Sequence, residues 1–167
     1  MQRRSILVGA AALGLLPTIS AARAQTAAAT ATAVDQAKLP ALMGGDFATA
    51  TSQLALEQSS SDVVKTFAQL EIAEQAAVAA AFGSAPGAAG LSKEHAAALA
   101  QLQALEGAQF DAMYVDGQIE GHEALLEIHQ RYARNGDDPM ARGAAMVGVP
   151  AIQTHLAMLR GIRQSLS

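Results

Sequence analysis

Apolar residues recur every three to four positions from about residue 46 almost to the end of the chain. This spacing is typical of helices that bury one face. No run in which apolar and polar residues alternate, bounded by Gly or Asn turns, predicts a β-hairpin. The pattern therefore predicts an all-α protein, with helices over residues 46–58, 62–82, 93–106, 107 or 108–134 and 139–165.

Capping residues and helix breakers set these boundaries. Asn135-Gly136 predicts a left-handed cap after the long fourth helix, and Pro150 predicts a bend in the last one. Three helices follow a side chain that can accept a backbone N–H bond, namely Ser60 or Ser61, Ser92, and Asp137 or Asp138. Four principal helices and one short helix between the second and third fit a ferritin-like four-helix bundle.

The long helix over residues 107–134 separates its two kinds of polar residue. At about 100° per residue, His122 lies in the middle of the apolar face, with His129 and Asp111 about 20° away and Gln118 about 40° away. Tyr114 lies at the border of the same face. The other charged residues of its middle part fall on the opposite side, so we expect the histidines to point inward and these charges outward; they are Asp116, Glu120, Glu123, Glu127 and Arg131.

The other principal helices each place a polar side chain at or beside their apolar face. Glu71 lies in the centre of such a face over residues 62–82, with Glu74 beside it. His155 lies among apolar residues of the last helix, and Glu57 lies at the edge of the face predicted for the first. Acidic side chains are rarely buried unless they are paired, so Glu71 needs a partner.

Two interpretations account for these inward polar residues. One is a metal site in the core of the bundle, with iron, manganese or zinc favoured over Cu(I) because soft ligands are few. The other is mutual hydrogen bonding without a metal. The chain contains no Glu-x-x-His motif of the di-iron type. The ligand candidates are Glu57, Glu71, Glu74, Gln118, His122 and His155, and the candidates for supporting residues are Asp111, Tyr114 and His129.

The first 24 residues have the features of a secretory signal peptide. Basic residues precede an apolar stretch and the small-residue pattern Ala22-Arg23-Ala24, which predicts cleavage after Ala24. Arg3-Arg4 is compatible with a twin-arginine signal or an ordinary basic start. We expect a flexible Ala/Thr-rich lead over residues 25–43, with Pro40 opposing a helix there, and a helical domain over 44–167 in the periplasm or outside the cell.

Charge and cysteine content exclude several classes of function. Of the 11 basic residues three lie in the predicted signal, which leaves 8 against 15 acidic ones and a net charge of −7. Such a chain does not favour nucleic acid, and no segment after the signal is apolar enough to span a membrane. The absence of cysteine excludes disulfides and thiolate chemistry. His95, in the first turn of the short helix, is expected on the surface.

Three stretches resemble a bacterial family described as domain of unknown function 4142. They read FATATSQLALEQSSSDVVKTFAQ, EHAAALAQLQALEGAQFDAMYVDGQIEGHEALLEI and VPAIQTHLAML. The residues that recur in that family are Phe110-Asp111, Tyr114, Gln118, His122 and His155-Leu156 in this chain. The resemblance implies a ferritin-like bundle after a signal peptide and brings no established activity. Many members carry Asp-His where this chain has Glu74-Gln75, which weakens a metal site transferred from the family.

These features support three hypotheses about function. The first is an exported bundle that acts by binding a ligand or an envelope partner, or by self-association, rather than by catalysis. The second is a ferritin-like protein that binds iron, manganese or zinc, with redox activity as one consequence. The third is a purely structural role in the cell envelope.

Overall fold

Helices make up almost all of the described chain. The computed structural model describes residues 35–166, and the predicted signal peptide and most of the predicted lead lie outside them. The described residues contain no strand, which confirms the all-α class for this part of the protein. The helices are α1 (Leu39–Gln58), α2 (Asp62–Ala81), α3 (Lys93–Gln103), α4 (Gly107–Asn135) and α5 (Pro139–Ser165).

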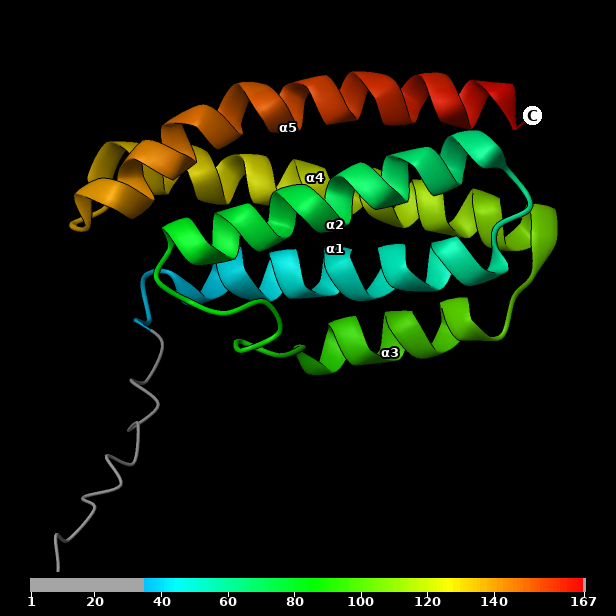
Figure 1. Cartoon of the computed structure of the whole chain (residues 1–167), viewed down its shortest axis with the longest axis horizontal. Coiled ribbons are helices and arrows are strands. Elements are labelled where there is room, and N and C mark those ends of the chain that lie inside the picture. Colours follow the sequence, from blue (N-terminus) through cyan, green and yellow to red (C-terminus); the bar gives the residue numbers. More distant parts are fainter. Residues whose placement is uncertain (1–34, 167) are drawn as a thin grey trace, which may run out of the picture. The chain divides into compact units, whose positions relative to one another are not determined.

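The four long helices pack as neighbours around a common interior. α1 contacts α2 and α4, and α5 contacts α4 and α2, so that each long helix has two long neighbours. The short α3 packs on the outside of α1 and α4, at the opposite edge from α5 (Figure 1). None of the described helices is long and apolar enough to cross a membrane.

Helix α1 begins at Leu39, seven residues before the predicted start at 46, so residues 39–43, which were assigned to the lead, belong to the helix. Pro40 occupies the first turn, where its missing N–H needs no partner, so it does not oppose the helix. Gly44 and Gly45 lie within the helix and do not end it. Side chains of neighbouring helices approach both positions too closely for a larger residue. A Cβ added to Gly44 would lie 2.7 Å from Leu125 Cδ2, and one on Gly45 would lie 2.5 Å from Gln75 Oε1.

The predicted N-caps are present, but one C-cap differs. The side chains of Ser61, Ser92 and Asp138 accept backbone N–H bonds at the starts of α2, α3 and α5. Gly136 is extended, with φ −67° and ψ 134°, and not left-handed as predicted. Its N–H bonds to the Tyr132 carbonyl, and Tyr132 lies so close that a Cβ on Gly136 would clash with its ring. Contact with Tyr132 therefore explains this glycine.

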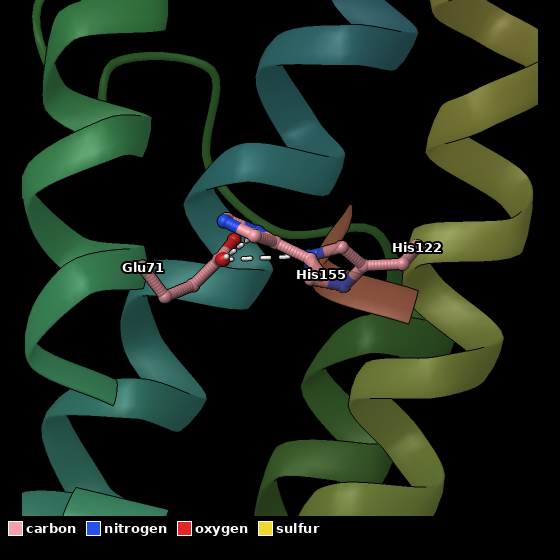
Figure 2. A group of neighbouring side chains, drawn as sticks. All are labelled: Glu71, His122 and His155. Carbon is pink, nitrogen blue, oxygen red and sulfur yellow. Dashed lines mark hydrogen bonds and ion pairs between the residues drawn. The ribbon is translucent and has the colours of Figure 1, made fainter. Parts of the chain in front are cut away.

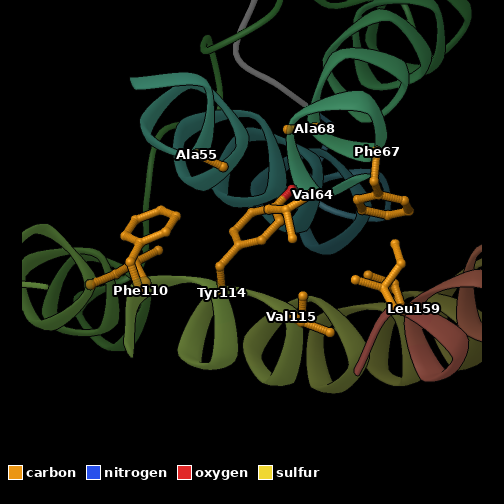
Figure 3. Packing of buried hydrophobic residues seen from close by; sticks show 10 residues of the cluster. Ala55, Val64, Phe67, Ala68, Phe110, Tyr114, Val115 and Leu159 are labelled. Atoms are coloured by element: carbon orange, nitrogen blue, oxygen red, sulfur yellow. The ribbon is translucent and has the colours of Figure 1, made fainter. Parts of the chain in front are cut away.

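Two groups of aromatic side chains fill the interior. Near one end, Phe67 of α2 faces Leu159 of α5, and Phe110 stacks on Tyr114 with ring centroids 6.0 Å apart (Figure 3). Near the other end, Phe82 packs on Tyr132 with centroids 5.2 Å apart. Burial of each such side chain stabilises the fold by about 2 kcal/mol. The polar residues of interest lie among these aromatic groups.

Candidate metal centre

Glu71 is a fully buried carboxylate on the inward face of α2. The exposed fraction of this residue is 0%, and it lies one helical turn from Phe67 on one side and from Gln75 on the other. The Gln75 amide donates a hydrogen bond of 2.9 Å to Glu71 Oε1. The second oxygen, Oε2, points away from this bond and makes no well-oriented hydrogen bond. A buried carboxylate oxygen without a donor is costly, so its surroundings need an explanation.

Two imidazoles from other helices face that oxygen. His122 Nε2, from α4, lies 3.3 Å from Glu71 Oε2, and His155 Nδ1, from α5, lies 3.2 Å from it. The two nitrogens are 3.3 Å apart. Figure 2 shows Glu71 reaching from α2 toward both rings. Three atoms from three helices therefore form a nearly equilateral triangle, and within residues 35–166 no other group of His, Asp and Glu side chains converges in this way.

The outer nitrogens of both rings fix which nitrogen carries the proton. His122 Nδ1 lies 2.8 Å from the Gln118 carbonyl oxygen, which can only accept, so this nitrogen is the donor. His155 Nε2 lies 3.3 Å from the Glu74 carboxylate, which favours a proton there. In the neutral rings, His122 Nε2 and His155 Nδ1 then carry lone pairs. Three acceptor atoms then face one another, and a cation held between them would satisfy all three.

Without a metal, a proton has to supply that positive charge. Burial opposes ionisation of Glu71, but contacts with His122 and His155 and the Gln75 bond outweigh it and lower its pKa to about 2. The contact with Glu71 raises the pKa of His155 against the effect of burial, and the charge of Glu74 adds to the rise. Ionised Glu71 and protonated His155 therefore stabilise each other when no metal is bound.

Side chains of α1 and α4 hold the triangle in place. Gln118 donates a 2.9 Å hydrogen bond to Thr51 Oγ1, and Thr51 donates to backbone carbonyls of its own helix. This chain of bonds fixes the turn of α4 whose carbonyl orients His122. Gly45 lets Gln75 approach α1, because any side chain there would meet the Gln75 amide oxygen. The small residues of α1 thus admit the polar groups that support Glu71 and His122.

Comparison with known families shows which family the chain belongs to. The model of the family described as Domain of unknown function (DUF4142) matches residues 19–162. The protein belongs to the DUF4142 family. No curated protein and no solved structure matches the chain. The resemblance noted from the sequence is therefore confirmed, and two of the motif residues that carried it, His122 and His155, form two corners of the triangle.

The DUF4142 chain places only some of the predicted ligand residues together. Glu71, His122 and His155 converge, while Glu74 and Gln118 support them from outside. Glu57 is exposed and lies outside this group. The inward face of α1 runs through small residues such as Ala48, Ser52 and Ala55 rather than through Phe47 and Leu54. Such a face gives no hydrophobic signal, so the sequence misplaced it.

The three predicted supporting residues are buried, but their hydrogen bonds and ring contacts involve residues outside the triangle. Asp111 accepts hydrogen bonds from Ser59 and Ser60 and so ties the start of α4 to the α1–α2 connection. The Tyr114 hydroxyl bonds to Ser52 Oγ at 2.8 Å. Burial raises the pKa of Tyr114 despite that bond, and the Glu71 charge adds to the rise. These contacts give Asp111 and Tyr114 structural roles.

His129 packs in the second aromatic group, away from the triangle. Its ring is tilted against Phe82 with centroids 5.7 Å apart, and its Nδ1 has no hydrogen-bond partner. Burial lowers the pKa of His129, so the neutral ring is favoured. His95, predicted on the surface, is only partly exposed because it stacks on Phe47 with centroids 4.4 Å apart.

Sequence analysis missed one residue that matters to the site. Thr51 links α1 to Gln118, and no helical pattern pointed to it because its neighbours on α1 are small. Gln75 follows Glu74 beside the predicted inward face but was not among the predicted site residues, yet its bond to Glu71 makes it a supporting residue. A threonine or glutamine on a helix is common, so only the distance across the helices reveals either role.

Proposed function

We propose that this protein is an exported, ferritin-like four-helix bundle that binds one divalent transition-metal ion through Glu71, His122 and His155. The supporting observation is the convergence of three lone-pair atoms at distances of 3.2–3.3 Å. Imidazole and carboxylate suit zinc, iron and manganese. Export rests on the predicted signal peptide, and the bundle on four long helices that each contact two others.

The size of the triangle fits a metal ion. A tetrahedral site with metal–ligand bonds of about 2.0–2.1 Å has ligand–ligand edges of about 3.3 Å. The three observed edges of 3.2–3.3 Å agree with that value. A zinc-sized ion therefore needs little movement of Glu71, His122 or His155 to bind.

The surroundings of the triangle also resemble those of metal ligands. Metal-binding histidines usually donate their other N–H to a carboxylate or a backbone carbonyl, which fixes the ring and raises its basicity. His155 has Glu74 in this position, and His122 has the Gln118 carbonyl. The remaining ligand atom, Glu71 Oε2, has no hydrogen bond, and Gln75 donates to the other oxygen of the same carboxylate. Each of the three ligand side chains thus already has an outer partner.

Three protein ligands leave a coordination position open. A closed structural zinc site uses four, whereas an open site keeps a place for water or another small molecule, which the ion polarises as a Lewis acid. This chain's residues orient the ligands and exclude bulk water, since Glu71 and His122 are almost fully buried. The proposal is therefore reversible binding of a metal, and it assigns no reaction.

Calorimetric titration of the exported protein tests the proposal after treatment with EDTA. We expect one zinc ion to bind per chain and to raise the melting temperature. At zinc concentrations of about 100 times Kd, the stabilisation should be about 2.7 kcal/mol. Glu71→Gln should remove both effects. His95→Gln is the matched control, because His95 lies on α3 outside the triangle.

Iron and manganese are titrated in the same way under anaerobic conditions. If none of the three metals binds above trace levels and none raises the melting temperature of the wild type, the proposal fails. Binding that survives Glu71→Gln and is lost in His95→Gln would also contradict it, because the metal would then lie elsewhere.

A further inference from the structure

A cleft of 370 Å³ opens between α1, α3 and α4 and reaches His122. This volume lies within the range of about 300–1,000 Å³ that is typical of small-molecule sites. Apolar side chains such as Phe47, Leu125 and Ile128 contribute most of its lining, and Gln118 and His122 lie at the polar part. The cleft is thus large enough for a molecule with one or two rings.

Two glycines of α4 keep this cleft open. Gly117 and Gly121 both line it, and a Cβ added to either would meet no atom within 4 Å. Packing therefore does not require glycine at these positions, although glycine destabilises a helix interior relative to alanine. The space beside α4 is real volume and not a close contact between helices.

The charges around the cleft have one sign. Glu94 of α3 and Glu120 of α4 line it and are both exposed, whereas no lysine or arginine does. An adjoining cavity of 270 Å³ adds Asp116, but this carboxylate is paired with Arg163 at 2.7 Å. Two carboxylates and an apolar interior favour a molecule with a positive end and an apolar body.

The aromatic side of the cleft also favours a positively charged ligand. His95 stacks on Phe47 with their planes 9° apart, so a flat aromatic pair lines the cleft. Aromatic faces attract organic cations as well as apolar rings. The Nδ1 atom of His95 is buried and has no hydrogen-bond partner.

We propose that this cleft binds a small amphiphilic amine. Its apolar body would lie along Phe47, Leu125 and Ile128, and its protonated amino group would lie at Glu94 and Glu120. This binding site goes beyond the metal centre and does not depend on it, although His122 borders both.

Three naphthalene compounds with the same rings test the charge preference. They are 1-naphthylmethylamine, 1-naphthalenemethanol and 1-naphthoate, titrated by calorimetry into EDTA-treated full-length protein at low salt. We expect saturable binding of one amine per chain, about tenfold tighter than the alcohol, with the carboxylate weakest. Replacing both Glu94→Gln and Glu120→Gln should bring the amine to the affinity of the alcohol.

Filling the cleft tests its location. Gly121→Leu should weaken amine binding at least tenfold while leaving the circular dichroism spectrum unchanged. Gly161→Leu is the matched control, because an added Cβ there also meets no atom within 4 Å but the residue lies on α5. If Gly121→Leu unfolds the protein, Gly117→Leu replaces it.

Three results would overturn the inference. They are no saturable binding of the amine, carboxylate binding as tight as amine binding, and full amine affinity in a folded cleft-filling variant. Since zinc is absent from these titrations, their outcome is independent of whether the metal proposal holds.

Discussion

The two buried histidines of α4 lie seven residues apart on the same face, yet they have opposite surroundings. His122 has a partner at each ring nitrogen, and a buried carboxylate faces it from α2. His129 meets the Phe82 ring and the backbone of Gly148, and its Nδ1 bonds to nothing. The inward position of a histidine on a helix is therefore not enough to make it a ligand. The residue across the interface decides its chemistry.

The largest expected difference between the two is in metal affinity. Structural zinc sites with four ligands bind with about 10–16 kcal/mol, so one ligand contributes about 2.5–4 kcal/mol. We predict that His122→Gln weakens zinc binding by about a hundredfold to a thousandfold, whereas His129→Gln changes it less than threefold. Competition with a chromophoric chelator measures both. Equal losses in the two variants would show that the histidines act through stability and not through ligation.

The second largest expected effect is the pH dependence of stability that Glu71 gives to the region of His122. The pKa of Glu71 is lowered from 4.5 to about 2, so its ionised form favours the folded state. This contribution, about 3 kcal/mol, is complete above pH 4.5 and is lost as the pH falls toward 2. Urea unfolding of metal-free protein should show this loss, and Glu71→Gln should remove it. A profile of the same shape in that variant would contradict the assignment.

His129 and His155 should affect stability near neutral pH in opposite directions. Burial lowers the pKa of His129 below 6.5, so its contribution is complete above pH 6.5 and declines as the pH falls. The pKa of His155 is raised above 6.5, so its contribution is present below pH 6.5 and declines as the pH rises through the folded-state value. His129→Gln should remove the first decline only, which unfolding curves between pH 5 and 8 would measure.

Glycine substitutions test how tightly each histidine region is packed. A methyl group on Gly148 would lie 2.6 Å from His129 Nδ1, and Phe82 contacts the same ring. We predict that Gly148→Ala destabilises the protein by about 1–3 kcal/mol. Gly161→Ala, the control with open space, should stabilise it by up to about 1 kcal/mol. A stabilising Gly148→Ala would mean that the His129 ring can move aside.

The metal region should respond to the same change differently. A methyl group on Gly45 would lie 2.5 Å from Gln75 Oε1, which is the end of a flexible side chain. Gly45→Ala should therefore leave stability within about 1 kcal/mol and displace the amide from Glu71. We expect zinc affinity to fall about tenfold through this lost outer partner. Calorimetry and urea unfolding on one preparation would distinguish the two effects.

The smallest expected effect on zinc binding and stability comes from the partly exposed Glu74. Its side chain is 30% exposed and contacts His155 Nε2 at 3.3 Å. Glu74→Gln should weaken zinc binding about tenfold with little change in stability, because it alters only the outer partner of one ligand. Glu57→Gln, on the exposed side of α1, is the matched control and should change nothing. A large loss on Glu74→Gln would make Glu74 a direct ligand.

Local patterns located most of the helices and the inward face of α4. Serine and aspartate caps marked the starts of α2, α3 and α5 correctly, because a cap depends on backbone N–H groups two or three positions away. The start of α1 was wrong by seven residues, and its inward face was wrong as well. Apart from Leu42 and Asp46, its buried positions are alanine, glycine, serine and threonine, which carry little hydrophobic signal.

The sequence by itself determined an all-α chain and the inward placement of Glu71, His122 and His155, since both follow from spacing along single helices. Only the tertiary structure decided that Glu71 meets the two imidazoles while Glu57 is exposed and His129 packs against Phe82. Those outcomes depend on how far α1, α2, α4 and α5 are rotated and shifted against one another. Side chains from all four helices set these shifts together, so no stretch of sequence contains them alone.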